Sequence, residues 1–226
     1  MKKRSIVADS RPPAHPAAPA EPPRTRRPLA GATFVIAAAA ASQLPVQGPA
    51  EVAFAGRSNA GKSSAINALA RQTRLAFASR TPGRTQQINI FALRSGALIA
   101  DLPGYGYAAV AKSLKREWQE FLWQYITTRD QLVGLVLLVD ARHGIARADV
   151  PVLADFVPSG RPVLVLATKA DKLGTSAQRV AQATIRTQLN ELFAAGAPNV
   201  VVQLFSSVTR QGVGEAEATI ASWVPG

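Results

Sequence analysis

Cysteine is absent from this 226-residue chain, and histidine is scarce. The lack of cysteine excludes a disulfide scaffold and a thiolate-bound metal, and it fits a reducing compartment such as the cytoplasm. The two histidines, His15 and His143, disfavour a histidine-based zinc site. The run of small apolar residues GATFVIAAAAAS (31–42) is shorter than the roughly 20 residues that a bilayer requires, so we expect no membrane segment.

Acidic residues are also few, and their distribution is uneven. Lys and Arg number 26 against 14 Asp and Glu, which gives a formal net charge of +12. Between Glu51 and Asp101 lie seven basic residues and no acidic one. A basic face attracts polyanions such as nucleic acid or anionic lipid, although a generally basic, solvated surface has the same composition.

Residues 1–30 differ in composition from the rest of the chain. They carry seven of the 16 prolines, many alanines and almost no large apolar side chain. Such a segment cannot bury enough surface to offset its ordering entropy, so we expect a disordered basic tail there and one folded domain over 31–226. The tail lacks the apolar core of a secretory signal. An Arg-rich transit peptide stays open, although the prolines oppose the helix that it needs.

Short apolar runs alternate with helical patterns over the rest of the chain. Runs that are apolar on both faces are typical of strands in a parallel sheet. QQINIFAL (86–93) instead alternates and precedes the turn Arg94-Ser95-Gly96, which predicts an antiparallel hairpin. The expected strands are EVAFA (51–55), QQINIFAL (86–93), ALIAD (97–101), VGLVLLVD (133–140), PVLVLAT (162–168) and VVVQLFS (200–206).

Helices are expected in KREWQEFLWQYI (115–126), over 176–195 and before Pro225. Alternation of this kind predicts an α/β fold with three layers. We expect a mostly parallel six-stranded sheet with one antiparallel edge hairpin strand, and helices on both faces.

The stretch GRSNAGKSS (56–64) matches the phosphate-loop pattern G-x-x-x-x-G-K-[ST], between an expected strand and an expected helix. Glycines permit the close backbone approach to a phosphate. Lys62 can supply charge to the β- and γ-phosphates, and the Ser63 hydroxyl can ligate Mg²⁺. ATP and GTP proteins share this loop, so it does not identify the base. The candidate binding residues are Gly56, Arg57, Ser58, Asn59, Ala60, Gly61, Lys62, Ser63 and Ser64.

Two stretches further along the chain end expected strands. In Asp101-Leu102-Pro103-Gly104, the carboxylate can hold Mg²⁺ through a water and the last residue can offer its N–H to a γ-phosphate. In Thr168-Lys169-Ala170-Asp171, the carboxylate can accept hydrogen bonds from guanine N1–H and the 2-amino group. Adenine would leave that carboxylate unpaired. The stem of Lys169 can lie along the base plane.

The order of these motifs is that of a GTPase domain. Ser206-Ser207-Val208 lies at the end of the last expected strand, and its backbone can donate to guanine O6. A Mg²⁺ ligand is then expected in a mobile first switch between Ser63 and Asp101. TPGRTQQ (81–87) fits, with Thr85 as the ligand. The candidate switch residues are Gly83, Arg84, Thr85, Gln86 and Gln87, and the candidate catalytic residues are Lys62, Thr85 and Gly104.

The motifs GRSNAGKSSAINAL, TPGRTQQIN, DLPGYGYA and TKADKL, with the serine pair and SQLP, resemble the EngB (YihA/YsxC) type of ribosome-biogenesis GTP-binding protein within the Era-like GTPases. The resemblance covers roughly residues 32–224. It implies a bacterial cytoplasmic GTPase in large-subunit assembly, linked to cell division and septation. It also implies GTP, GDP and Mg²⁺ as ligands, with Phe205, Ser206 and Ser207 at the guanine. The implied partner is the large ribosomal subunit or its precursor, through ribosomal RNA, with neither membrane nor DNA.

Three positions carry further consequences. Thr168 stands where most GTPases have Asn, which shortens its reach toward the base. Tyr105 follows Gly104 where Ras-like enzymes carry a water-orienting Gln, so we expect slow intrinsic hydrolysis that needs a partner or an ion. In several Era-like GTPases an Asn at the position of Asn59 coordinates a monovalent cation, which predicts K⁺-responsive hydrolysis. Alternatively, Asn59 stabilises the loop through a side-chain hydrogen bond.

Basic residues around the expected first switch, Arg71, Arg74, Arg80 and Arg84, are candidates for contact with ribosomal RNA. The rival hypothesis is a nucleotide-regulated module that binds a protein and hydrolyses GTP incidentally. A P-loop kinase or ATPase is the third reading, and TKAD opposes it.

Overall fold

The computed structural model describes residues 29–45, 47–77, 87–105, 112–194 and 196–224, and for 112–119 it describes the backbone alone. The expected basic tail therefore lies almost wholly outside the described residues. Leu29 is fully buried, so the packed part of the chain includes at least this residue.

The described strands form one seven-stranded sheet in the order β1-β3-β4-β2-β5-β6-β7. β3 is antiparallel to both of its neighbours, and the other pairs are parallel. The hairpin predicted between β3 and β4 is thereby confirmed. The strands are β1 (Thr33–Ala38), β2 (Glu51–Gly56), β3 (Ile88–Ala92), β4 (Leu98–Asp101), β5 (Leu132–Asp140), β6 (Val163–Thr168) and β7 (Val200–Leu204).

The expectation of six strands was wrong by one, because β1 pairs with β3 and takes the sheet edge. The sequence of β1, TFVIAA, runs directly into further alanines and does not alternate. Its first three residues are exposed, as an edge strand allows. Neither a period of two nor a fully apolar run therefore marked it as a strand.

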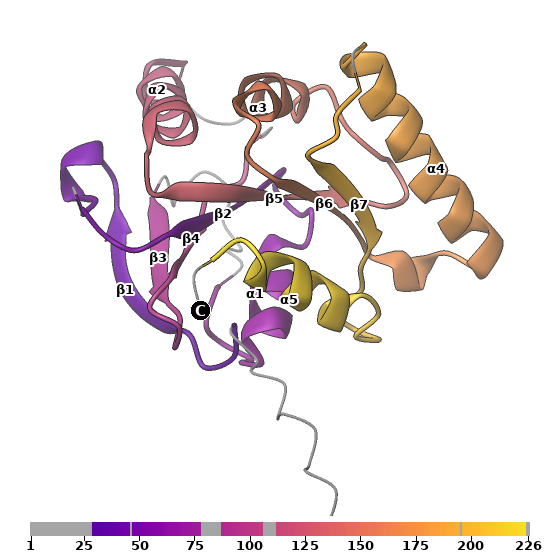
Figure 1. Ribbon diagram of the computed structural model, residues 1–226, viewed down its shortest axis with the longest axis horizontal. Coiled ribbons are helices and arrows are strands. Elements are labelled where there is room, and N and C mark those ends of the chain that lie inside the picture. Colours follow the sequence, from indigo (N-terminus) through magenta and orange to yellow (C-terminus); the bar gives the residue numbers. More distant parts are fainter. Residues whose placement is uncertain (1–28, 46, 78–86, 106–111, 195, 225–226) are drawn as a thin grey trace, which may run out of the picture.

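The sheet lies between two layers of helices (Figure 1). Figure 1 shows α2, α3 and α4 over one face and α1 and α5 over the other, which confirms the three-layer α/β fold. The short helix α3 was not expected from the sequence. The helices are α1 (Lys62–Ala70), α2 (Lys112–Thr128), α3 (Val150–Phe156), α4 (Thr175–Leu192) and α5 (Val213–Ala221).

Alternate residues of the central strand serve the two faces of the sheet. Val52 and Phe54 pack into the cluster that includes Ile66 of α1, whereas Ala53 and Ala55 pack into the cluster on the α2, α3 and α4 side. All four strand side chains are 0–1% exposed. Burial on both faces explains why EVAFA is a continuous apolar run.

Hydrogen bonds connect the carboxyl end of α2 to the residues where β2 and β5 begin. Glu51, the first residue of β2, is fully buried and accepts hydrogen bonds from the Tyr125 hydroxyl at 2.8 Å and from Arg129 Nε at 2.7 Å. Arg161 donates to the carbonyl oxygens of Ile126 at 3.1 Å and Leu132 at 2.9 Å. A guanidinium at a helix carboxyl end satisfies carbonyls that have no partner within the helix.

Because β2, β4, β5, β6 and β7 run in parallel, their carboxyl ends share one edge of the sheet. Ligands of open α/β sheets bind at this edge. The loops that leave these strands contain the expected site segments.

Candidate functional site

The candidate phosphate loop connects β2 to α1. Gly61 has φ +94° and Asn59 has φ +66°, so the loop makes two left-handed steps before the helix begins at Lys62. A Cβ on Gly56 would lie 2.7 Å from the carbonyl oxygen of Leu138 in β5. That approach excludes a side chain at Gly56 and holds the loop against the neighbouring strand.

The Lys62 ammonium group is paired with the Asp101 carboxylate across the site. The two side chains are 12% and 5% exposed. The structure therefore joins the first and second predicted motifs, which lie 39 residues apart in the sequence. Ser63 and Ser64 lie in the first turn of α1.

The DLPG segment folds back on the phosphate loop. The Leu102 N–H donates to the Phe54 carbonyl at 3.0 Å, and Gly104 lies so near the loop that a Cβ there would be 3.1 Å from Ser58. Leu102 and Pro103 are buried, whereas Gly104 is exposed. Gly104, which is expected to donate its N–H to a γ-phosphate, is therefore more exposed than the two residues before it.

The candidate guanine-binding residues converge from β6 and β7. Ser206, which is fully buried, donates its hydroxyl to Asp171 Oδ1 at 2.6 Å. That hydrogen bond holds the pKa of Asp171 below its ordinary value. The Ala170 N–H donates to the Phe205 carbonyl at 3.1 Å, so the two loops are also joined through their backbones. Ser207 is half-buried beside them.

Thr168 joins the base segment to the phosphate loop. Its hydroxyl lies 2.6 Å from the Ala60 carbonyl oxygen and 2.9 Å from that of Val139, and the residue is 3% exposed. The hydroxyl is therefore engaged with backbone, in agreement with the short reach expected of a threonine here.

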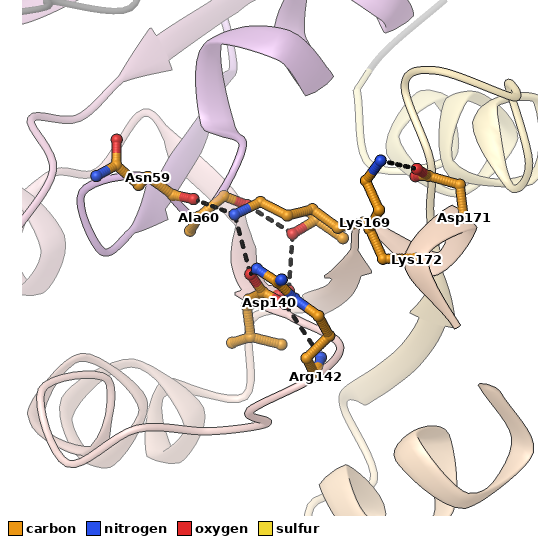
Figure 2. A network of polar contacts seen from close by, with 9 residues as sticks. Asn59, Ala60, Asp140, Arg142, Lys169, Asp171 and Lys172 are labelled. Carbon is orange, nitrogen blue, oxygen red and sulfur yellow. Dashed lines mark hydrogen bonds and ion pairs between the residues drawn. The ribbon is translucent and has the colours of Figure 1, made fainter. Parts of the chain in front are cut away.

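Asp140, which sequence reasoning missed, lies at the centre of the polar network in Figure 2. Its carboxylate pairs with Lys169 Nζ at 2.9 Å and with the Arg142 guanidinium at 2.7 Å. Lys169, held in a left-handed conformation at φ +58°, also donates to the Asn59 carbonyl at 2.7 Å. Hydrogen bonds from Arg142 hold the pKa of Asp140 well below its usual value, although burial opposes them.

Replacing Asp140 with Ala is expected to weaken GDP and GTP binding by about tenfold, because Lys169 loses its ionic partner beside the loop. Arg142→Ala should change both affinities by less than about twofold, since Arg142 is exposed and contacts Asp140 from the solvent side. Titration calorimetry with both nucleotides measures the difference. Equal losses in the two variants would contradict a positioning role for Asp140.

A cavity of about 250 Å³ adjoins this network. Arg57, Ser58 and Asn59 line one side of it, and Asp140 and Asp149 lie on the side formed by β5 and the loop before α3. The phosphate loop is therefore accessible from the β5 side. This opening was not predicted from the sequence.

Tyr105, predicted to be unable to orient a water, directs its hydroxyl elsewhere. It is 9% exposed and donates to Asp149 Oδ1 at 2.7 Å. Burial, and then the charge of Asp149, raise the pKa of Tyr105 well above its ordinary value. Asp149 was not predicted as part of the site, because nothing in its local sequence marks a contact 44 residues away.

The predicted first switch is only partly described. Gly83, Arg84, Thr85 and Gln86 lie outside the described residues, and Gln87 is half-buried just before β3. The role of Thr85 as a Mg²⁺ ligand stays a prediction. No three His, Cys, Asp or Glu side chains gather as a metal site in the described ranges.

Comparison with known proteins identifies the family. The "Probable GTP-binding protein EngB" of Azoarcus sp. (strain BH72) is 51% identical over 193 residues, which cover 85% of this chain and 91% of the relative. The chain belongs to the EngB family of GTP-binding proteins. A second EngB protein, from Neisseria meningitidis serogroup B (strain ATCC BAA-335 / MC58), is 48% identical over 176 residues, 78% of this chain and 83% of the relative.

Other comparisons agree with the EngB assignment. The family model described as "50S ribosome-binding GTPase" matches residues 51–169, from β2 to the base segment. A crystal structure of a probable GTP-binding protein EngB superposes with a TM-score of 0.60 at 22% identity, over 76% of this chain and 97% of that one. At that identity the superposition shows the fold alone. The chain is a P-loop GTPase of the EngB family, and GTP and GDP are its nucleotides.

Proposed function

We propose that this GTPase acts as a nucleotide switch in the assembly of the large ribosomal subunit. The observation that carries the proposal is the match of residues 51–169 to a family described as ribosome-binding. A related fold supports it: Era was crystallised with MgGDPNP and nucleotides 1506–1542 of 16S ribosomal RNA. It has a TM-score of 0.59 at 22% identity over 80% of this chain and 58% of that one. The link to division and septation, the cytoplasmic location and a basic tail that ends near residue 30 belong to the same proposal.

The donor set at the head of α1 suits a nucleotide with Mg²⁺. An ammonium group, a hydroxyl and a carboxylate, from Lys62, Ser63 and Asp101, are the groups that phosphate and a hard cation require. Mg²⁺, when bound, would neutralise charge on the terminal phosphates. Lys62 would supply a positive charge to the same oxygens, and Asp101 would orient a water toward the metal.

We assign recognition of the base to Asp171, with Ser206 holding its carboxylate and Lys169 lying along the ring. Among the described residues of this arrangement, none replaces the water-orienting glutamine of Ras-like enzymes, because the Tyr105 hydroxyl is bonded to Asp149. Slow intrinsic hydrolysis, accelerated by a partner or an ion, follows from that engagement.

K⁺ is the ion that we propose for this acceleration. Among the described residues, the hydrogen bond to Asn59 goes to its backbone carbonyl and not to its carboxamide, and in Figure 2 the carboxamide points away from Lys169. A cation held there would oppose the charge that develops on the transferred phosphate. We expect turnover about tenfold faster in K⁺ than in Na⁺ at equal ionic strength, and no such difference in Asn59→Ala. Equal rates for the unaltered protein would remove the cation hypothesis.

The basic surface near α1 is the proposed contact with ribosomal RNA. Arg71 and Arg74 are exposed just after this helix. The guanidinium group of Arg71 lies 3.8 Å from the Glu217 carboxylate. Arg80 and Arg84 lie outside the described residues. Because phosphate contacts release counterions, binding through these residues should weaken steeply with salt.

Purified ribosomal subunits test the proposal. Large subunits, with small subunits as control, should raise the GTP turnover and bind the protein more tightly with a GTP analogue than with GDP. Arg74→Glu should weaken that binding about tenfold, whereas Arg179→Glu, an exposed charge reversal on α4 across the sheet, should not. No response to either subunit, with a salt-insensitive complex with a protein, would support the rival binding-module function.

The proposed partners do not include a membrane. No helix in the described part of the chain combines the length and apolar character needed to cross a bilayer.

A further inference from the structure

Tyr105 is fixed at three points in the site. Its hydroxyl donates to Asp149, its backbone N–H donates to the Gly56 carbonyl at 3.4 Å, and its own carbonyl accepts from the Ser58 N–H at 3.1 Å. The backbone contacts form a parallel bridge between Arg57 and Tyr105, beyond the end of the β2–β4 pairing. The residue after Gly104 is therefore bound to the phosphate loop on one side and to the start of α3 on the other.

Asp149 is an unusual group to bury, because the positive charge of Arg57 offsets the effect of burial on its pKa only in part. It is 1% exposed, and its carboxylate accepts from the Tyr105 hydroxyl and from the Ala146 N–H at 2.8 Å. Burial raises the pKa of Asp149, and no ion pair involves it within the described residues. A buried carboxylate costs stability, so an apolar residue would serve packing better. Among the described residues, Tyr105 is the one side chain that donates a hydrogen bond to this carboxylate.

We propose that Asp149 acts through Tyr105 as a positioning residue for Gly104, and so determines how the protein distinguishes GTP from GDP. The inference rests on the proposed function and on the predicted hydrogen bond from the Gly104 N–H to the γ-phosphate. Gly104 lacks a side chain of its own, so its orientation depends on what holds its neighbours. Pro103 restricts the backbone before it, and the Tyr105–Asp149 bond restrains the chain after it.

The protein contains a matched control for this bond. The Tyr125 hydroxyl donates to Glu51 at 2.8 Å, and these side chains are also buried, at 3% and 0% exposure. That pair lies at the opposite end of β2, where the strand begins, whereas Tyr105 contacts Gly56, where it ends. Tyr→Phe at either position removes one hydroxyl from one buried carboxylate.

The experiment compares Tyr105→Phe with Tyr125→Phe in the full chain. Dissociation constants for GDP and for a non-hydrolysable GTP analogue are measured with Mg²⁺, together with the melting temperature. Tyr105→Phe should weaken analogue binding about tenfold while GDP binding changes less than about twofold. Both substitutions should lower the melting temperature by a similar amount. Tyr125→Phe, however, should leave the ratio of the two dissociation constants unchanged.

A double-mutant cycle tests whether Asp149 acts through the tyrosine. Asp149→Asn should lower the analogue-to-GDP preference, and adding Tyr105→Phe should lower it no further. An unchanged preference in Tyr105→Phe, or the same change in Tyr125→Phe, would overturn the inference while leaving the GTPase assignment intact. Failure of the unaltered protein to bind either nucleotide would instead contradict the proposed function.

Discussion

Asp171→Asn is expected to weaken GTP and GDP binding by about 10²- to 10³-fold and to create affinity for xanthine nucleotides. The Ser206 hydroxyl accepts from the N–H groups of Val208 at 3.2 Å and Thr209 at 3.1 Å, so its hydrogen is directed at residue 171. An asparagine there would turn its oxygen toward Ser206 and its amino group toward the base. That donor suits the 2-oxo group of xanthine and opposes the 2-amino group of guanine.

Fluorescence titration with GDP, XDP and ADP measures this exchange. Ser206→Ala is the informative companion, because it releases residue 171 and should weaken guanine binding without favouring xanthine. ADP should bind neither the protein nor Asp171→Asn. Binding of ADP by the unaltered protein, or an Asp171→Asn variant that keeps its guanine preference, would remove the base site from this position.

The same carboxylate sets a limit on pH dependence. Since its pKa is lowered in the fold, Asp171 is ionised well below neutrality. Its contribution is complete above the ordinary aspartate pKa of about 3.9 and is lost only as the pH falls through the lower folded value. Guanine preference should therefore be the same at pH 8 and at pH 5.

Lys62→Met should abolish measurable GTP hydrolysis and weaken GTP binding by about 10²-fold or more. Methionine retains most of the length of the side chain but not its charge, so the terminal phosphates lose their fixed cation. The substitution also leaves Asp101, whose side chain is 5% exposed, without its ionic partner. An unpaired buried carboxylate costs stability, and a lower melting temperature is expected as well.

Single-turnover hydrolysis and equilibrium binding separate these effects. Lys172→Met is the matched control, because the Lys172 side chain is 63% exposed and its ammonium group lies 3.6 Å from Asp171 rather than beside the phosphate loop. That variant should hydrolyse GTP within about twofold of the normal rate. Comparable losses in both variants would show that charge near the site, and not the position of Lys62, is what matters.

The sequence was informative wherever one short segment carries its own chemistry. GRSNAGKS and TKAD each combine a strand end with a fixed set of side chains, so the expected loops lie at the ends of β2 and β6. Asp140 and Asp149 were not predicted because the contacts that place them in the site, with Lys169 and Tyr105, span 29 and 44 residues of sequence. Only the pairing of strands brings such residues together, and no local pattern encodes it.

The edge strand β1 was missed for a different reason. Phe34 and Val35 are 58% and 50% exposed, so burial did not impose an apolar pattern on this segment. Its partner β3 supplies the order through backbone hydrogen bonds, which leave no trace in the side chains of β1.

The hydrogen bonds at the carboxyl end of α2 restrict how this helix can move. Arg161 and Glu51 form hydrogen bonds with residues between 125 and 132, where β2 and β5 begin and at the opposite end of β2 from the phosphate loop. Translating the helix would break these hydrogen bonds together, whereas rotating it about its fastened end would preserve them. A displacement of α2 that keeps these hydrogen bonds is therefore largest at its amino end, the end that is nearer to Gly104 in the sequence.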